Sequence, residues 1–251
     1  VYDAIFRNNL GNNTKNGQPA EAKKVYDAIL GLKPEEKDAY FLRGSAELEL
    51  GDYESAKADF DQAISMDPKN YDRLIEIYEA LAAHGYREVG QEYLQNVLDT
   101  AKQLDAYDSG RIYYYLGEYQ KAYLALDEAR DKGGADSYLY LGRAYAATGD
   151  YNYASSVYNN YLSKQGPNAE IYNELGLCEM AKKEYQNALA AFQAGKQIEG
   201  NSLMQTLCFN EIVAYEYLED YQQAEVLMNA YLQNYPDDQA AIREQQFLST
   251  R

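Results

Sequence analysis

The sequence predicts an all-α fold, a solenoid of repeated antiparallel helix-turn-helix units, and three observations lead to that prediction. A hydrophobic pattern recurs along the 251 residues with a period of about 34. Within each period apolar residues recur at three- and four-residue steps, which places them on one face of a helix. Glycine or proline falls between most of these stretches and ends the helices. Each unit of such an array contacts mainly its neighbours.

The clearest unit covers residues 37–70, and its pattern divides into two helices. The residues at four-residue steps in the first helix are Tyr40, Gly44 and Leu48, and the corresponding residues of the second helix are Ala56, Phe60 and Ala63. Gly51 and Asp52 break the chain between the two helices. Pro68 ends the second, because proline cannot donate a helical hydrogen bond and disfavours helix at the residue before it.

This unit resembles the tetratricopeptide repeat. The family's places are filled by Tyr40, Gly44, Gly51, Tyr53, Ala56, Phe60, Ala63 and Pro68. Gly44 and Ala56 let the two helices approach closely, where a larger side chain would cost about 1–3 kcal/mol. The resemblance implies a right-handed superhelical solenoid in which the first helices line a concave groove.

The remaining units follow in register along a single predicted solenoid, 1–251. Units start near residues 3, 37, 71, 103, 135, 169 and 205. The first unit has a poor first helix near Tyr2 and a clear second helix with Ala22, Tyr26 and Ile29. The fourth is expected to stop at Gly133 and Gly134.

The last units depart slightly from the pattern. The fifth and sixth keep the small residue at the helix crossing, as Gly142 and Gly176, whereas the seventh has Ile212 there. Residues 239–249 then predict a capping helix, with Ile242 and Phe247 on an apolar edge against the last hairpin.

Composition limits the classes of partner. The net charge is −17, and clusters of Lys and Arg that attract nucleic acid or anionic lipid are missing from the sequence. We therefore expect no nucleic-acid ligand, and no membrane insertion by this chain, because no apolar run approaches the roughly 20 residues of a membrane span. The chain begins with Val1, which is compatible with a bacterial surface lipoprotein or secreted protein that has lost its signal or lipid anchor, and equally with a cytoplasmic protein.

Chemistry-bearing residues are few, which predicts a non-catalytic protein with no metal and no cofactor. Cys178 and Cys208 fall in different first helices at places six residues apart, about 9 Å along parallel helices, so we expect free thiols. The only histidine, His84, precedes Gly85 at a helix end, where it can face the C-terminal dipole.

The predicted binding surface is the concave groove that the resemblance implies. Its candidate residues, read from the family's groove places, are Tyr107, Arg111, Tyr114, Tyr115, Leu139, Arg143, Asn173 and Leu177. Arg111 and Arg143 occupy the same place in consecutive units, so a pair of guanidinium groups beside tyrosines could anchor an acidic group of a ligand. The family's chaperone-tail ligand is not expected, since Phe41 and Ser45 stand where it needs a lysine and an asparagine.

Two questions stay open at this point. The arginines can instead be structural, with Arg111 pairing with Glu79 and Arg143 pairing with Asp136 or Glu170. The partner is predicted to be a protein or peptide segment, but 28 tyrosines and no tryptophan also suit an alternative, a cell-surface glycan-binding protein. Binding through the convex face or the chain ends is a further alternative.

Overall fold

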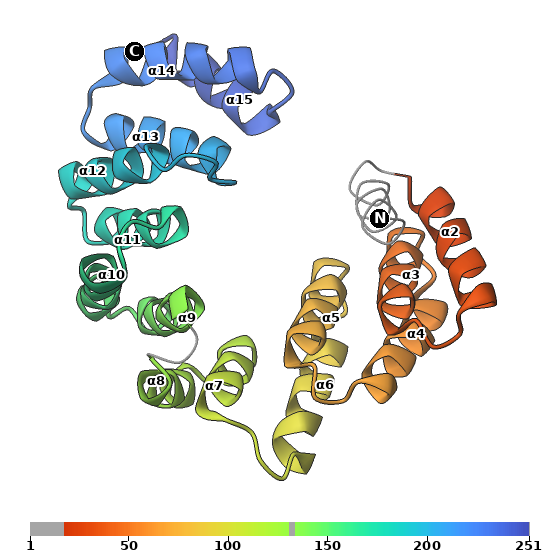
Figure 1. Cartoon of the computed structure of the whole chain (residues 1–251). Helices are drawn as coiled ribbons and strands as arrows, with labels where there is room; N and C mark the ends of the chain where they lie inside the picture. Colours follow the sequence, from red (N-terminus) through yellow and green to blue (C-terminus); the bar gives the residue numbers. More distant parts are fainter. Residues whose placement is uncertain (1–17, 131–133, 251) are drawn as a thin grey trace. The chain divides into compact units, whose positions relative to one another are not determined.

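The computed structural model describes residues 18–130 and 134–250, and within those ranges it is all helical (Figure 1). The helices form two units, which divide between Leu104 and Asp105. The first unit holds α2 (Pro19–Leu32), α3 (Lys37–Glu49), α4 (Tyr53–Met66), α5 (Tyr71–Ala83) and α6 (Arg87–Thr100). The second holds α7 (Ala106–Tyr115), α8 (Tyr119–Glu128), α9 (Gly134–Ala147), α10 (Tyr151–Gln165), α11 (Ala169–Ala181), α12 (Tyr185–Lys196), α13 (Met204–Tyr217), α14 (Tyr221–Asn234) and α15 (Gln239–Leu248).

The helices pair as helix-turn-helix units, and the first helices α3, α5, α7, α9, α11 and α13 begin at residues 37, 71, 106, 134, 169 and 204. The predicted first helix near Tyr2 lies outside the described residues. One detail differs, because α8 ends at Glu128 and Gly134 opens α9 with a φ of 57°. The glycine expected to end one helix therefore begins the next.

The turns between paired helices use the same local chemistry in several hairpins. Asp52, Asp150 and Asp220 each precede a second helix, and each side chain accepts a hydrogen bond from a backbone N–H of its first turn, at 3.1 to 3.2 Å. Gly51 and Gly149, just before these caps, have φ values of 79° and 84°. Lys183 and Glu219 hold the same place with φ values of 64° and 60°, a conformation that non-glycine residues seldom adopt.

Close helix crossings explain the small residues of the pattern. A Cβ added at Gly142 would lie 2.3 Å from the Tyr158 ring, and one at Gly176 would lie 2.3 Å from the Phe192 ring. At the crossing of the seventh unit, Ile212 is buried with Met228, so a branched side chain and a flexible thioether replace glycine and an aromatic ring. The substitution at Ile212 thus preserves the packing.

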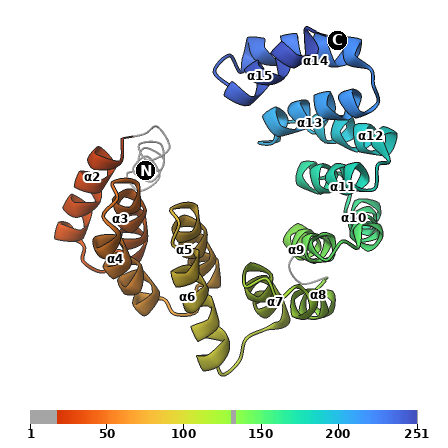
Figure 2. The ribbon, with the colours of Figure 1, turned by 180° about the vertical axis from the view of Figure 1, so that it is seen from behind.

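Within the second unit each hairpin packs on the next, and the first helices line one side. Helix α9 packs against both α7 and α11, whereas the second helices of successive hairpins meet only weakly (Figures 1 and 2). Helices α7, α9 and α11 therefore form one continuous side of this unit. The largest core cluster lies between α8 and α12 and includes Tyr138, Tyr158 and Cys178.

Helix α15 caps the last hairpin, but with a different edge from the one expected. Ala241 and Leu248 are its buried residues and join the cluster around Met228, whereas Phe247 remains 40% exposed. The apolar edge is rotated by one residue relative to the prediction, since Ala241 and Leu248 lie two turns apart on one face.

Candidate functional site

The candidate site is the inner face of α7, α9 and α11, where the sequence placed all eight groove residues. Helices α7 and α11 both contact α9, so their side chains form one surface within the second unit. Asn210 of α13 extends the surface by donating to Asn173 Oδ1 at 2.9 Å. The first helices are thus joined by side-chain contacts as well as by packing.

Arg111 is a buried part of this surface. Its side chain is 8% exposed, its Nη2 lies 2.5 Å from Asp108 one turn earlier, and its guanidinium stacks over the Tyr107 ring at 4.3 Å. The sequence interpretation offered Glu79 as its partner and missed Asp108, although the three-residue spacing on a helix allows such a pair. Burial leaves Arg111 little area for a ligand.

Arg143 is more exposed than Arg111 and forms ion pairs with two carboxylates. Its Nη2 lies 3.0 Å from Glu170 and 2.7 Å from Glu174, both on α11. Glu170 was one of the alternative partners predicted, whereas Glu174 was missed, even though it follows Glu170 by one helical turn. Burial opposes the charge on Arg143, but the Glu174 carboxylate outweighs burial and raises the pKa of the guanidinium. The charge on Arg143 is therefore more than balanced by its neighbours.

A cluster of tyrosines lies beside Arg143. Tyr114 makes edge-on ring contacts with Tyr115 at 5.4 Å and with Tyr140 at 5.6 Å, and the hydroxyl groups of Tyr115 and Tyr140 are 3.1 Å apart. Burial raises the pKa of Tyr114, while the Arg143 charge opposes that rise. Tyr140 was not among the predicted site residues, but its place on α9 three residues before Arg143 could have indicated it.

The three other predicted residues differ in what they expose. Leu139 is 3% exposed and Asn173 is 8% exposed, so both are framework residues of the inner face. Leu177 is 43% exposed on α11. The accessible part of the predicted site is therefore Leu177, Arg143 and the half-buried rings of Tyr107, Tyr114 and Tyr115.

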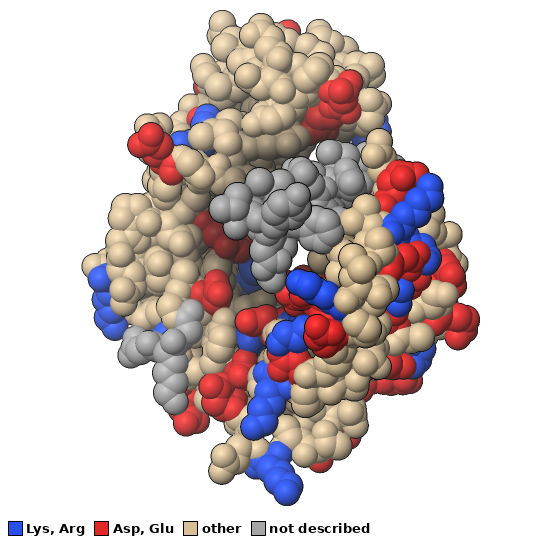
Figure 3. All heavy atoms as spheres, turned by 45° about the vertical axis from the view of Figure 1, so that its right-hand side comes forward, with Lys and Arg blue, Asp and Glu red and all other residues tan. Residues whose placement is uncertain are grey.

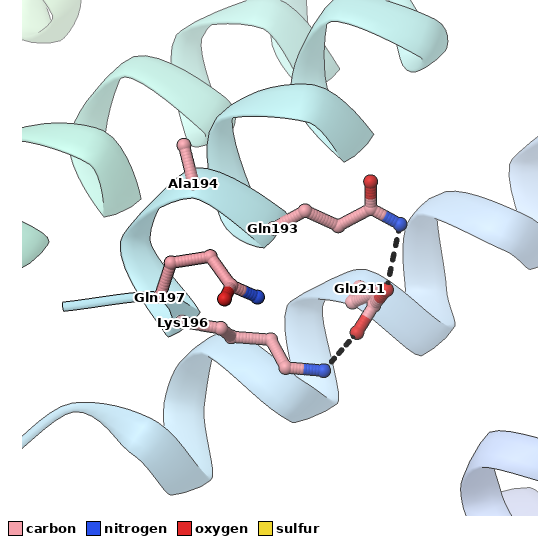
Figure 4. A pocket seen from close by; sticks show the side chains of 5 residues that line it. All are labelled: Gln193, Ala194, Lys196, Gln197 and Glu211. Carbon is pink, nitrogen blue, oxygen red and sulfur yellow. Dashed lines mark hydrogen bonds and ion pairs between the residues drawn. The ribbon is translucent and has the colours of Figure 1, made fainter. Parts of the chain in front are cut away.

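A second charged group lies between α12 and α13 and was not predicted. Glu211 is 5% exposed, accepts a hydrogen bond from Gln193 at 2.9 Å, and pairs with Lys196 (Figure 4). Burial opposes the charge on Lys196, but Glu211 raises the pKa of the ammonium group. Because Glu211 already has two partners, the group serves to join α12 to α13.

Other predicted features have simple roles in the described residues. Cys178 and Cys208 are free thiols, and His84 Nδ1 lies 2.8 Å from the Ala80 carbonyl at the end of α5. The described residues contain no group of His, Cys, Asp and Glu side chains that could hold a metal ion. Of the helices described, none is long and apolar enough to cross a membrane.

Surface charge follows the overall composition. In the view of Figure 3, acidic and basic side chains of the described residues are interspersed, and no separate basic area is visible. This distribution gives no electrostatic footprint for a phosphate backbone on the face in view.

The family follows from a comparison with known protein families. The model of the tetratricopeptide repeat family matches residues 15–71, 107–154 and 141–201, more than half of the chain. The chain belongs to the tetratricopeptide repeat family. A search of curated proteins found no match. The tetratricopeptide units matched by the family model include α7, α9 and α11, so the candidate site is built from the repeats themselves.

Solved structures share this tetratricopeptide fold at low sequence identity. A tetratricopeptide repeat protein from Parabacteroides merdae matches with a TM-score of 0.65 and 14% identity, covering 100% of this chain and 99% of the other. Yeast Tom70 matches with a TM-score of 0.61, 14% identity and coverage of 86% and 48%. The Cut9–Hcn1 hetero-tetramer of APC/C matches with a TM-score of 0.58, 17% identity and coverage of 95% and 48%. This chain spans about half the length of the last two.

Proposed function

We propose that this tetratricopeptide repeat protein is a non-catalytic scaffold that binds a peptide or protein segment on the inner face of its second unit. The observation that supports this proposal is the surface formed by Leu177, Arg143 and the tyrosines of α7 and α9. Tyrosine rings give a large contact area with little loss of side-chain entropy, and tyrosine and arginine are frequent anchors of protein interfaces. A peptide segment laid across the three helices would contact all of these groups.

Family membership supports the class of partner. Among the structural relatives, Cut9–Hcn1 is a hetero-tetramer, an assembly between protein chains. Repeat solenoids present extended surfaces that suit a peptide better than a small molecule. The proposed function is therefore protein–protein interaction, with the partner recognised by shape and side-chain contacts.

The geometry also bears on how the arginines take part. A ligand carboxylate at Arg143 would have to compete with Glu170 and Glu174, which are already held 3.0 and 2.7 Å away. Arg111 is bonded to Asp108 beneath Tyr107. We therefore assign Arg143 a contact role at the edge of the groove, and Arg111, Leu139 and Asn173 the role of supporting it.

A pair of matched leucine variants tests the proposal. Peptides selected from a displayed random library on the parent chain are measured by calorimetry against Leu177→Ser and Leu124→Ser. Leu124 is also exposed, at 68%, but lies on α8, a second helix. We expect Leu177→Ser to weaken binding by about tenfold, which corresponds to about 1.4 kcal/mol, and Leu124→Ser to leave it unchanged.

The controls decide what a negative result means. Both variants must keep the helicity and denaturant midpoint of the parent, since each removes an exposed side chain. Selection of no peptide, or weakening by Leu124→Ser instead of Leu177→Ser, would refute inner-face recognition.

A further inference from the structure

A polar cavity of about 460 Å³ opens where α10, α11 and α12 meet, away from the inner face. Its lining includes Asn152, Ser155 and Asn159 of α10, Glu179 of α11, Lys182 at the end of α11, and Asn187 of α12. Two of these three elements are second helices, so the cavity belongs to the other side of the hairpins. It shares no residue with the proposed inner-face site.

Glu179 is the buried polar group of this cavity. The residue is 6% exposed, and its Oε1 accepts from Ser155 Oγ at 2.8 Å and pairs with Lys182 Nζ at 2.7 Å. Both contacts use the same oxygen, and none of the residues that the structure describes donates to Oε2. Oε2 is not among the buried polar atoms that lack a partner in the described residues, so it opens to the solvent of the cavity and can accept a hydrogen bond from a ligand there.

Three exposed carboxamides surround this carboxylate. Within the described part of the chain, the side chains of Asn152, Asn159 and Asn187 form no hydrogen bonds with protein groups. Each carboxamide offers two donors and an acceptor. Asn152 and Asn159 lie seven residues apart on one face of α10, about 10 Å along the helix, which matches about three residues of an extended peptide.

The cavity lies at a junction that differs from the preceding junction at two repeat places. In the preceding junction the same two repeat places hold Tyr123 and Tyr145, whose rings stack at 4.5 Å. Here the places hold Ser155 and Glu179, which leave unfilled the volume that two rings would take. The buried polar pair of this cavity is thus found where the preceding junction has two stacked rings.

We propose that this cavity binds an extended, uncharged polar peptide segment of a partner protein. The asparagines bond its backbone N–H and C=O groups, and a short donor side chain, such as that of serine or threonine, reaches Glu179 Oε2. Because Glu179 and Lys182 compensate each other's charge, the cavity favours neither an acidic nor a basic segment. No aromatic ring is among the lining residues, all of them described, so a sugar face has no ring on which to stack.

The experiment observes the asparagine side chains directly. The full chain is labelled with ¹⁵N-asparagine and titrated with a panel of short peptides of Ser, Thr, Asn and Gly. We expect at least one peptide to shift the NH₂ signals of Asn152, Asn159 and Asn187 together. Panels of acidic peptides, basic peptides and maltooligosaccharides form the other arms, and we expect none of them to shift all three signals.

Two matched variants on α10 separate the cavity from its surroundings. Ser156→Tyr places a ring in the cavity lining, whereas Ser163→Tyr makes the same change two turns away on the same face of α10, outside the cavity. Both serines are exposed and bond only a backbone carbonyl of their own helix. We expect Ser156→Tyr to weaken binding by about tenfold or more and Ser163→Tyr to leave it unchanged.

Three outcomes would overturn the proposal. They are the absence of shifts with every uncharged peptide up to about 1 mM, equal binding by the two tyrosine variants, and shifts caused by a charged peptide or the sugar panel instead. Leu177→Ser is the control for the inner face. Binding that survives Leu177→Ser but fails in Ser156→Tyr belongs to this cavity, whatever the outcome for the proposed function.

Discussion

Two junctions in the second unit occupy the same repeat places and contain opposite chemistry. Where α9 packs on α8, Tyr145 stacks on Tyr123 with an interplanar angle of 9° and also contacts Tyr153. Where α11 packs on α10, Ser155 and Glu179 take those places. Both hairpins nevertheless keep glycine against an aromatic ring at the crossing. The comparison indicates that both hairpins keep the crossing, whereas the junction places can hold either stacked rings or hydrogen-bonded polar groups.

The largest loss of stability is expected at the glycine crossing that the α9–α10 and α11–α12 hairpins share. Gly142→Val and Gly176→Val would each force a branched side chain against a ring that already lies 2.3 Å from the first added carbon. We expect each to lower the free energy of unfolding by about 3 kcal/mol, measured by urea denaturation.

A glycine in open space provides the control for this prediction. Gly31 lies within α2, and a Cβ there would meet no atom within 4 Å. Gly31→Ala is therefore expected to stabilise by about 0.5–1 kcal/mol through helix propensity. Tolerance of valine at Gly142 or Gly176 would show that the crossing does not maintain the fold.

A smaller effect is expected where the two junctions differ. Tyr145→Ser removes a ring held between two others, and we expect a loss of about 2 kcal/mol. Glu179→Gln keeps an acceptor for Ser155 and removes only the pairing with Lys182, so we expect a loss below about 1 kcal/mol. Denaturant midpoints of the two variants measure this difference. Equal losses would mean that the polar junction stabilises the fold as much as the aromatic one.

The helical pattern could be predicted because each unit carries its own start, crossing and stop. Gly44 and Ala56 predict a close crossing from sequence alone, and in the structure a Cβ added at Gly44 would lie 3.1 Å from the Ala56 carbonyl oxygen. The departures depend on three-dimensional packing that the repeat pattern does not encode. Phe247 satisfied the spacing of an apolar edge, yet Ala241 and Leu248 face the last hairpin. The helical phase of a short capping helix is set by what it packs on.

The position of the candidate residues on the first helices could be predicted, and so could Glu170 as a partner of Arg143, whereas Asp108 and Glu174 could not. The family places located Arg111 and Arg143 on the inner face, whereas Asp108 and Glu174 depend on rotamers of long side chains. The cavity at Glu179 was missed, although the sequence held a signal for it. Tyr113, Tyr145 and Tyr215 occupy the place that Glu179 takes in its own unit, and Glu47 occupies it in the second unit, where it pairs with Lys23. Polar residues at this place therefore indicate a junction without stacked aromatic rings.

Glu216 provides a half-buried carboxyl that pairs with no cation among the described residues, in contrast to Glu179 with Lys182. Burial, and then the neighbouring Glu244 of α15, raise the pKa of Glu216 to about 7. The folded state therefore holds the proton more tightly than the unfolded state. The stability that comes from this difference in proton binding is fully present below the ordinary glutamate pKa and is lost as the pH rises through about 7. The loss in the free energy of unfolding is about 1–2 kcal/mol, because the carboxyl group is only half-buried.

The measurement compares Glu216→Gln with the parent between about pH 5 and about pH 8. We expect the unfolding free energy of the variant to increase relative to that of the parent as the pH rises. Glu244→Gln should reduce the pH dependence as well, since it removes the neighbouring charge. A difference between variant and parent that does not change with pH would show that Glu216 ionises normally in the folded chain.

The core beneath the polar junction differs from its surface in chemical reactivity and not in stability. Cys178 precedes Glu179 on α11 but packs in the cluster with Tyr138 and Tyr158, and burial raises the pKa of its thiol to about 12. Cys208 on α13 is half-buried. Because the thiolate is the reactive form, iodoacetamide should label Cys178 at least about 100-fold more slowly than Cys208 in the native protein, followed by peptide mass spectrometry. Both should react quickly in denaturant. Equally fast native labelling would mean that the α10–α11 junction opens to its core, so that replacing stacked tyrosines by Ser155 and Glu179 loosens the hairpin contact itself and not only its rim.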